Sequence, residues 1–261
     1  MNQSANNSID LNSDLGESYG PWTMGNDSAM LDIVSSANIA CGFHAGGPEE
    51  MVRTIKLCQQ KSVAIGAHPG FDDLRGFGRR RLPVSDTDDL QAQLIYQVGA
   101  FMGIARSEGA TVAHIKLHGA LSNMACEDDQ LANICATAFH RVAPDIAILA
   151  QAVTPLEVAA RASGSPVIRE VFADREYNAD GTLVARGSPG AVIHDSERAA
   201  DRVLKMIEEQ SIKAIDGQSF KVKPESICVH GDNPAAVKMA GQIRLALEKA
   251  GIRIAAPAFS N

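Results

Sequence analysis

Several motifs that mark well-known enzyme classes are missing from this chain of 261 residues. There is no GxxxxGK(S/T), no GxGxxG and no GxSxG, which argues against a P-loop, a Rossmann dinucleotide site and a serine hydrolase. The chain has no CxxC motif, which would predict a zinc ribbon or a redox pair, and no HExxH motif, which would predict a zincin. A catalytic site must therefore be assembled by the fold from residues that lie far apart in the chain.

The chain also has no excess of positive charge and no long apolar run. Its formal net charge is -7, which disfavours nucleic-acid binding because such binding requires an electropositive surface. No apolar stretch approaches the roughly 18 residues that span a bilayer, and the N-terminus lacks the basic and apolar regions of a secretory signal. We therefore expect a cytoplasmic protein without a membrane partner. Its five cysteines, unpaired in spacing, are expected to be reduced core residues.

What the chain does contain is a repeated alternation of short apolar runs and longer amphipathic segments. This alternation predicts a parallel sheet covered by helices, and either an open sheet or a closed barrel fits it. The expected strands lie near 9–12, 37–41, 63–67, 111–117, 146–150, 167–172, 227–230 and 252–255. The expected helices are 48–60, 86–108, 127–142 and 196–210, with two more that start at Thr154 and Asn233. We expect one domain over 9–261 behind a disordered tail at 1–8.

Local signals define several element ends. Pro48 with two glutamates behind it is typical of a first helical turn, because proline needs no N–H partner there and acids suit the positive end of the helix dipole. Residues 154–157 read Thr-Pro-Leu-Glu, which predicts a capping box. Residues 179–181 predict a hairpin-like turn inside an insertion at 173–194, after the sixth strand.

Polar side chains gather at the ends of the expected strands. Because the carboxyl ends of parallel strands meet at one edge, we expect one cleft to collect them. His114, Lys116 and His118 are two apart, so on a strand they share one face, and an inward lysine needs a carboxylate or a substrate anion beside it. His140 lies within a helix and is expected to be structural, and His194 receives no role. The candidate residues are Asn12, Asp14, His44, His68, Lys116, His118, Glu170, Asp174, Arg175, His230 and Asp232.

Two glycine-containing loops favour anions. The loop at 42–48 runs directly into a helix start, whose free N–H groups attract phosphate or carboxylate. The loop at 76–81 places glycines beside three arginines, of which Arg79 is the first. Ordinary turn glycines would explain either loop taken singly.

A metal site is a separate possibility for the same residues. Asp14, His44, His68 and His118 form an aspartate–histidine set of the kind that activates water. Without a zincin-type ligand motif, we expect structural or acid–base roles for these histidines ahead of metal ligation. No tightly bound metal is therefore expected, and the metal ligands stay unknown.

Seven ordered blocks of the sequence stand out: 10–18, 38–46, 66–69, 76–80, 118–121, 170–175 with Tyr177, and 229–232. They spread over most of the chain, which makes a chance match a poor explanation. Together these blocks resemble the signature of the LamB/YcsF family.

The resemblance implies a fold and a function that composition and spacing do not reach. It implies an α/β fold, a distorted (β/α)7 TIM-like barrel of the glycoside hydrolase/deacetylase type. It also implies the A component of an enzyme that opens 5-oxo-L-proline to L-glutamate, coupled to hydrolysis of ATP with Mg²⁺. Subunits B and C are then the expected partners.

That chemistry suggests roles for the candidate residues. Lys116 or Arg175 is expected to meet substrate carboxylate or phosphoryl charge, and Asp14, His44 and His118 are candidates for proton transfer. His68 and Glu170 complete the expected catalytic group. The expected substrate- or phosphate-binding residues are Asn12, Arg79, Asp174, Arg175, His230 and Asp232, of which the aspartates could also orient histidines or hold Mg²⁺.

The chain departs from the family pattern at Gly47, Leu117 and Ser122 and in the stretch 70–72, and several of these departures lie beside expected site residues. These departures leave another lactam or amide open as the substrate. Two further alternatives stay open: a stand-alone metal-dependent deacetylase or amidohydrolase, and a non-catalytic subunit that presents substrate to a partner.

Overall fold

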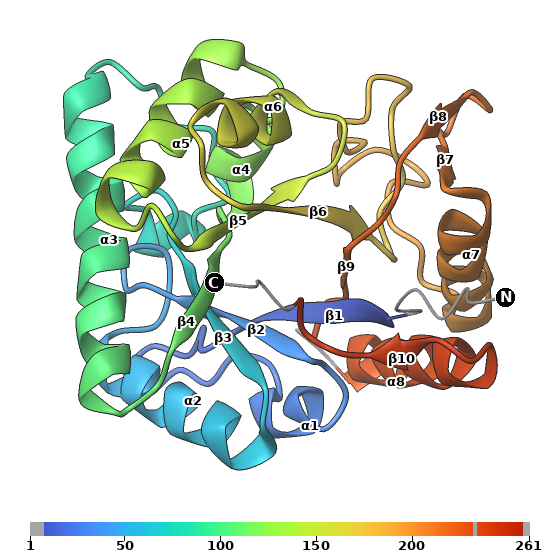
Figure 1. The fold of residues 1–261 in the computed structure, drawn as a ribbon, viewed down its shortest axis with the longest axis horizontal. Coiled ribbons are helices and arrows are strands. Elements are labelled where there is room, and N and C mark those ends of the chain that lie inside the picture. Colours follow the sequence, from blue (N-terminus) through green and yellow to red (C-terminus); the bar gives the residue numbers. More distant parts are fainter. Residues whose placement is uncertain (1–7, 232–233, 258–261) are drawn as a thin grey trace, which may run out of the picture.

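Seven parallel strands close into a barrel in the computed structural model, which describes residues 8–231 and 234–257 (Figure 1). Strand β9 pairs with both β6 and β1 and so completes the ring. The barrel strands are β1 (Ser8–Leu15), β2 (Ser36–Ala40), β3 (Ala64–His68), β4 (Val112–Ile115), β5 (Ala147–Gln151), β6 (Val167–Phe172) and β9 (Ser226–Cys228). The expected seven-stranded α/β barrel is confirmed, and the open-sheet alternative is wrong because closure pairs both edges.

Helices surround the barrel on its outside (Figure 1). Within the described residues they are α1 (Asp27–Leu31), α2 (Pro48–Lys61), α3 (Thr87–Ser107), α4 (Gly119–Ala125), α5 (Asp129–Val142), α6 (Pro155–Ala162), α7 (Ser196–Glu209) and α8 (Pro234–Lys249). The short helices α1 and α4 were not predicted, because five to seven residues are too few to show a helical apolar stripe. An antiparallel pair, β7 (Ser211–Lys213) and β8 (Ser219–Lys221), was not predicted either.

The two chain ends of the barrel lie side by side. The last strand, β10 (Arg253–Ile254), pairs in parallel with the start of β1, where Ser8 aligns with Arg253. Ser8 therefore belongs to the barrel and not to a tail. The rest of the expected tail, residues 1–7, lies outside the described residues, as do Asp232 and Asn233.

Most helix ends follow their local signals, but one does not. Helix α2 begins at Pro48 as predicted. The capping box at α6 is wrong: the Thr154 hydroxyl donates to the Gln151 carbonyl at 2.7 Å and does not cap the helix. Glu157 instead accepts the N–H of Val153 at 2.9 Å. The hydroxyl thus bonds the end of β5 and not the first turn of α6.

The insertion after β6 folds back over the carboxyl end of the barrel. Its predicted turn is confirmed, since Tyr177 and Leu183 form an antiparallel bridge and the Asn178 N–H donates to the Thr182 carbonyl at 2.8 Å. This fold brings Arg175 and Arg186 to the same cavity. The insertion therefore supplies one wall of the candidate site.

The main apolar core lies between the barrel and its helices, while the barrel interior holds a polar network beside a small apolar cluster of Ala147, Leu149 and Ile168. All five cysteines are buried and free, which confirms the prediction of reduced core residues. No helix in the described part of the chain is long and apolar enough to cross a membrane. The buried polar residues that point to an interior network include Asp10, Asn12, Ser36, Asn38, His114, Lys116, Glu170 and Ser226.

We predict that Gly66→Ala destabilises the protein. A Cβ at Gly66 in β3 would lie 2.2 Å from Nε2 of His114, a buried ring that is held 2.6 Å from Oδ1 of Asn38. Overpacking of this kind costs about 1–3 kcal/mol. The matched control is Gly103→Ala in α3, where a Cβ meets no described atom within 4 Å.

The control should be stabilised by about 0.5–1 kcal/mol, because alanine favours a helix over glycine. Urea unfolding followed by circular dichroism measures both variants. Equal free energies of unfolding in the two would contradict the close packing of β3 against His114.

Candidate active site

A buried lysine stands at the centre of the barrel's carboxyl end. Its backbone continues beyond β4, since the Lys116 N–H donates to the Ala67 carbonyl at 2.9 Å. Nζ of Lys116 lies 2.7 Å from Oε1 of Glu170 on β6 and 3.1 Å from Oδ1 of Asp14 on β1. The predicted inward lysine therefore has two carboxylates as partners, one from β1 and one from β6.

Charge balance makes the three groups interdependent. Burial alone would lower the pKa of Lys116, but Asp14 and Glu170 hold it well above its usual value. Burial opposes ionisation of Asp14, yet His68 and Lys116 bring its pKa well below normal. Burial raises the pKa of Glu170, and Lys116 offsets only part of that rise. One cation thus faces two carboxyls, and Glu170 is the one that more readily holds a proton.

A network of amides and hydroxyls supports this group from below. The Asn38 amide donates to Oδ1 of Asn12 and to Oδ1 of Asp14, each at 2.8 Å. The Asn12 amide donates to the Ser226 hydroxyl at 2.8 Å, and Oδ1 of Asn12 accepts from Lys116 at 3.1 Å. Asn12, predicted to bind substrate, is fully buried and instead positions Lys116. Lys116, Asp14 and Glu170 therefore lie on a hydrogen-bonded layer of side chains.

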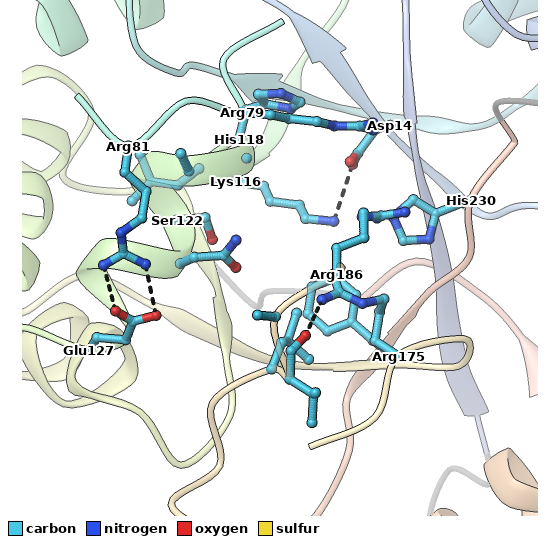
Figure 2. Close-up of a pocket in the computed structure, with 18 residues that line it drawn as sticks. Asp14, Arg79, Arg81, Lys116, His118, Ser122, Glu127, Arg175, Arg186 and His230 are labelled. Carbon is cyan, nitrogen blue, oxygen red and sulfur yellow. Dashed lines mark hydrogen bonds and ion pairs between the residues drawn. The ribbon is translucent and has the colours of Figure 1, made fainter. Parts of the chain in front are cut away.

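A cavity of about 350 Å³ opens above Lys116, a volume within the usual range for small-ligand sites. Figure 2 shows Lys116 between Asp14 and a wall that carries Arg175, Arg186 and His230. The residues that line the cavity include Asp14, Arg79, Arg81, Lys116, His118, Ser122, Glu127, Arg175, Arg186 and His230.

The charges of the lining favour an anion. Arg81 is already paired with Glu127 at 2.6 Å, and Arg80 pairs with Asp73 outside the cavity. Arg79 therefore is the arginine of the 76–81 loop that faces the cavity without a carboxylate partner in the described residues, its guanidinium 4.9 Å from the Phe77 ring centre. The Arg175 guanidinium donates to the Val184 carbonyl at 2.7 Å, and this hydrogen bond holds the side chain against the insertion.

His230 and Asp174 form a pair at the edge of the same cavity. Nδ1 of His230 lies 2.7 Å from Oδ2 of Asp174. Burial works against ionisation of Asp174, but His230 next to it lowers the pKa of that carboxyl. Arg186 lies 3.4 Å from the other ring nitrogen of His230. Asp174 thus orients His230, a histidine that was predicted to bind substrate and not to transfer protons.

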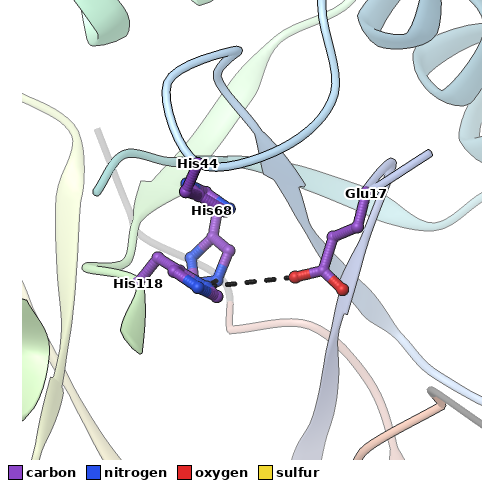
Figure 3. A group of neighbouring side chains, drawn as sticks. All are labelled: Glu17, His44, His68 and His118. Atoms are coloured by element: carbon purple, nitrogen blue, oxygen red, sulfur yellow. Dashed lines mark hydrogen bonds and ion pairs between the residues drawn. The ribbon is translucent and has the colours of Figure 1, made fainter. Parts of the chain in front are cut away.

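Three other histidines cluster beside the cavity with a glutamate (Figure 3). The His44 and His118 rings stack with centres 3.7 Å apart, and Nδ1 of His118 lies 3.0 Å from Nε2 of His68. Burial lowers the pKa of His118 to about 3 and that of His44 well below its usual value. The glutamate is Glu17, which follows β1 and lies 3.9 Å from His118.

The predicted residues thus separate into groups. Asp14, Arg79, Lys116, His118, Arg175 and His230 face the cavity, whereas Asn12 and Glu170 lie below it and His44 and His68 lie to one side. His114, which shares its strand face with Lys116 as predicted, bonds Asn38. His140 bonds Ser165 at 3.2 Å, in keeping with its structural role. Asp232 lies outside the described residues.

Two residues at the site escaped sequence reasoning. Glu17 lies three positions after Asp14, within the first family block, and that position was its only signal. Arg186 lies in the insertion, where no strand end predicts its direction. His118 was placed on a strand, but β4 ends at Ile115, and the chain turns into α4 through Gly119 with a φ of 57°.

Comparisons with known proteins agree with this architecture. Residues 9–260 match the LamB/YcsF family. The chain is 48% identical over 247 residues to a protein of Nitrobacter hamburgensis that is named as the A subunit of 5-oxoprolinase, covering 95% of this chain and 97% of that one. It is 49% identical over 248 residues to a protein of Ruegeria pomeroyi with the same name, covering 95% and 98%.

A solved structure extends the similarity to three dimensions. The lactam utilization protein from Thermus thermophilus superimposes with a TM-score of 0.89 at 40% identity. The match covers 95% of this chain and 99% of that one. The fold is therefore shared over nearly the whole length of both proteins.

We predict that Lys116→Met destabilises the protein by about 3–5 kcal/mol, because it leaves buried carboxylates without their cation. Adding Glu170→Gln to Lys116→Met should restore part of that loss, since it removes one of the two uncompensated charges. Urea unfolding of the single and double variants gives the coupling free energy. A double variant no more stable than Lys116→Met alone would disprove the charge pairing.

Proposed function

The chain belongs to the LamB/YcsF family, and from this premise we propose that it is the A subunit of a 5-oxoprolinase. The proposed reaction opens 5-oxo-L-proline to L-glutamate with hydrolysis of ATP and Mg²⁺ present, in a cytoplasmic complex with subunits B and C. Relatives about half identical to the chain over nearly its full length support this proposal by their names. The observation that carries it is the cationic cavity whose floor is Lys116 between two carboxyls.

The coupling to ATP has a chemical reason. Amide resonance and low ring strain make the five-membered lactam a poor target for water. Transfer of the γ-phosphoryl group to the lactam oxygen makes the ring carbon electrophilic. One water then opens the C–N bond and a second releases phosphate, so the products are glutamate, ADP and inorganic phosphate.

The cavity offers a group for each charge that develops during these reaction steps. Arg79 and Arg175 lie where they can bind the substrate carboxylate, which leaves the lactam oxygen to face the floor. Lys116 supplies a fixed positive charge for the phosphoryl group and the developing oxyanion. Neighbouring His68 and Lys116 hold the pKa of Asp14 well below its usual value, which favours the carboxylate, and Asp14 borders the cavity, so it is the group placed to accept a proton from water. Glu170 holds Lys116 in place from below.

We expect glutamate release from 5-oxo-L-proline only when this chain, subunits B and C, and ATP are all present. Lys116→Ala and Asp14→Asn should each lower kcat by about 100–1,000-fold, the usual cost of losing one preorganised charge. Lys61→Ala, on the far side of the barrel at the end of α2, is the matched control and should keep full turnover. A chromatographic assay of glutamate and ADP measures all of these.

Two other outcomes would each refute the proposal. Glutamate release by this chain alone without ATP would make it a stand-alone amide hydrolase. Full turnover by the complex with Lys116→Ala or Asp14→Asn, with binding of 5-oxo-L-proline retained, would make it a substrate-presenting subunit without catalytic groups.

The substrate carboxylate gives a separate prediction. Arg79→Ala should raise KM for 5-oxo-L-proline by about 10–100-fold with little change in kcat, since a charged hydrogen bond contributes about 1.5–3 kcal/mol. Arg106→Ala, an exposed arginine in the last turn of α3, is the control. Steady-state kinetics of the complex separate the two constants, and an unchanged KM in Arg79→Ala would exclude this carboxylate contact.

A further inference from the structure

The cluster of Glu17, His44, His68 and His118 has features that acid–base catalysis does not explain. Each residue follows or ends one of the first four strands: Glu17 after β1, His44 after β2, His68 at the end of β3 and His118 beyond β4. One potential ligand atom from each lies within 4.8 Å of those of the other three. The cluster therefore gathers four separate segments at one point of the barrel mouth.

The hydrogen bonds of two rings define where their hydrogens are. Nδ1 of His68 lies 2.8 Å from the Lys116 carbonyl, and Nε2 of His118 lies 2.9 Å from the Phe77 carbonyl. A carbonyl oxygen only accepts, so each of these nitrogens must carry a hydrogen and donate it. The opposite nitrogens, Nε2 of His68 and Nδ1 of His118, are then the ones left to bind a proton or a metal ion, and Nε2 of His68 also lies 3.3 Å from Oδ2 of Asp14.

Those two nitrogens face one another. Nε2 of His68 and Nδ1 of His118 are 3.0 Å apart, which is unfavourable unless a proton or a metal ion lies between them or beside them. A carbonyl behind the far nitrogen of a ring is also the arrangement that orients histidine ligands in metal sites. Both rings are therefore prepared to bind a cation from the same side.

The surroundings of His44 favour a metal ion over a proton as the partner of these histidines. It is almost fully buried, and neither of its ring nitrogens has a hydrogen-bond partner among the described residues. Its ring stacks on His118 with an interplanar angle of 2° and meets His68 edge-on at 5.5 Å. One proton shared by His68 and His118 would leave His44 without a partner, whereas a metal ion would also take a nitrogen of His44 after that ring rotates out of its stack on His118, because parallel stacked rings do not direct their lone pairs at one point.

We propose that Glu17, His44, His68 and His118 form a binding site for a divalent transition ion of the zinc type. Three imidazoles and one carboxylate are ligands that zinc and its neighbours prefer over calcium or magnesium. Ligand atoms about 2.0–2.1 Å from a tetrahedral ion stand roughly 3.3 Å apart. The separations of 3.0 Å from His118 to His68 and 3.9 Å from His118 to Glu17 bracket that spacing.

The surroundings give the ion an entry path and suggest what it does. Glu17 and His44 line a surface pocket beside Tyr19 and Trp22, and His118 lines the reaction cavity on the other side. Four protein ligands close a zinc site in the way that structural sites are closed. The ion would therefore join the carboxyl ends of β1, β2, β3 and β4 next to Lys116 and Asp14. This site does not depend on the proposed reaction.

The test is metal binding by the purified full-length chain. After removal of metal with a chelator, Zn²⁺ is titrated in competition with a chromophoric chelator, and Co²⁺ is added separately to record its absorption bands. We expect one Zn²⁺ per chain, a higher thermal midpoint with Zn²⁺ than without it, and tetrahedral Co²⁺ bands. Glu17→Gln, at the rim of the cluster, and His44→Asn should each weaken Zn²⁺ binding by ~10-fold or more.

His140→Asn is the matched control, because His140 lies in α5 outside the cluster and should leave binding unchanged. Circular dichroism of each apo variant shows whether it is folded, and Glu17→Gln alone carries the test if His44→Asn is not. Absence of micromolar Zn²⁺ binding by the unmodified chain overturns the proposal. So does Zn²⁺ affinity that is equal in the unmodified chain and in folded Glu17→Gln.

Discussion

A single buried cation determines how the interior of this barrel is built. Lys116 is almost inaccessible to water, so its charge is tolerable only beside Asp14 and Glu170, which reach it from β1 and β6. The carboxylates depend equally on the lysine. This mutual dependence ties three strands of the ring together. It also explains why hydrogen-bonded amides and hydroxyls occupy the part of the barrel interior around Lys116, where aliphatic layers are usual.

The same arrangement prepares the carboxyl end for anionic ligands. The floor holds a fixed positive charge, and the insertion after β6 adds Arg175 and Arg186 to one wall. Asp14 shares in both parts, because it pairs with Lys116 below and borders the cavity above. Its second oxygen lies 3.3 Å from Nε2 of His68, so the lysine group and the histidine cluster are adjacent parts of one site. A substitution in either part therefore alters the electrostatic environment of the other.

Sequence reasoning succeeded where a local rule decides the outcome. Pro48 begins a helix because its constraint acts within one turn, and Lys116 points inward because strand residues alternate. Sequence reasoning failed where a partner outside the local segment determines the conformation. Thr154 does not cap its helix because its hydroxyl donates to the carbonyl of Gln151. Arg186 reaches the cavity only because the insertion folds back. The tautomers of His68 and His118 likewise follow from carbonyls in other segments.

We propose that 5-oxo-L-proline binds in the cavity above Lys116. A crystal structure of the chain soaked with 5-oxo-L-proline would locate the ligand. We predict the lactam oxygen within hydrogen-bonding distance of Nζ of Lys116 and the carboxylate beside Arg79 or Arg175. Ordered ligand at another place, with this cavity filled only by water, would refute this binding site.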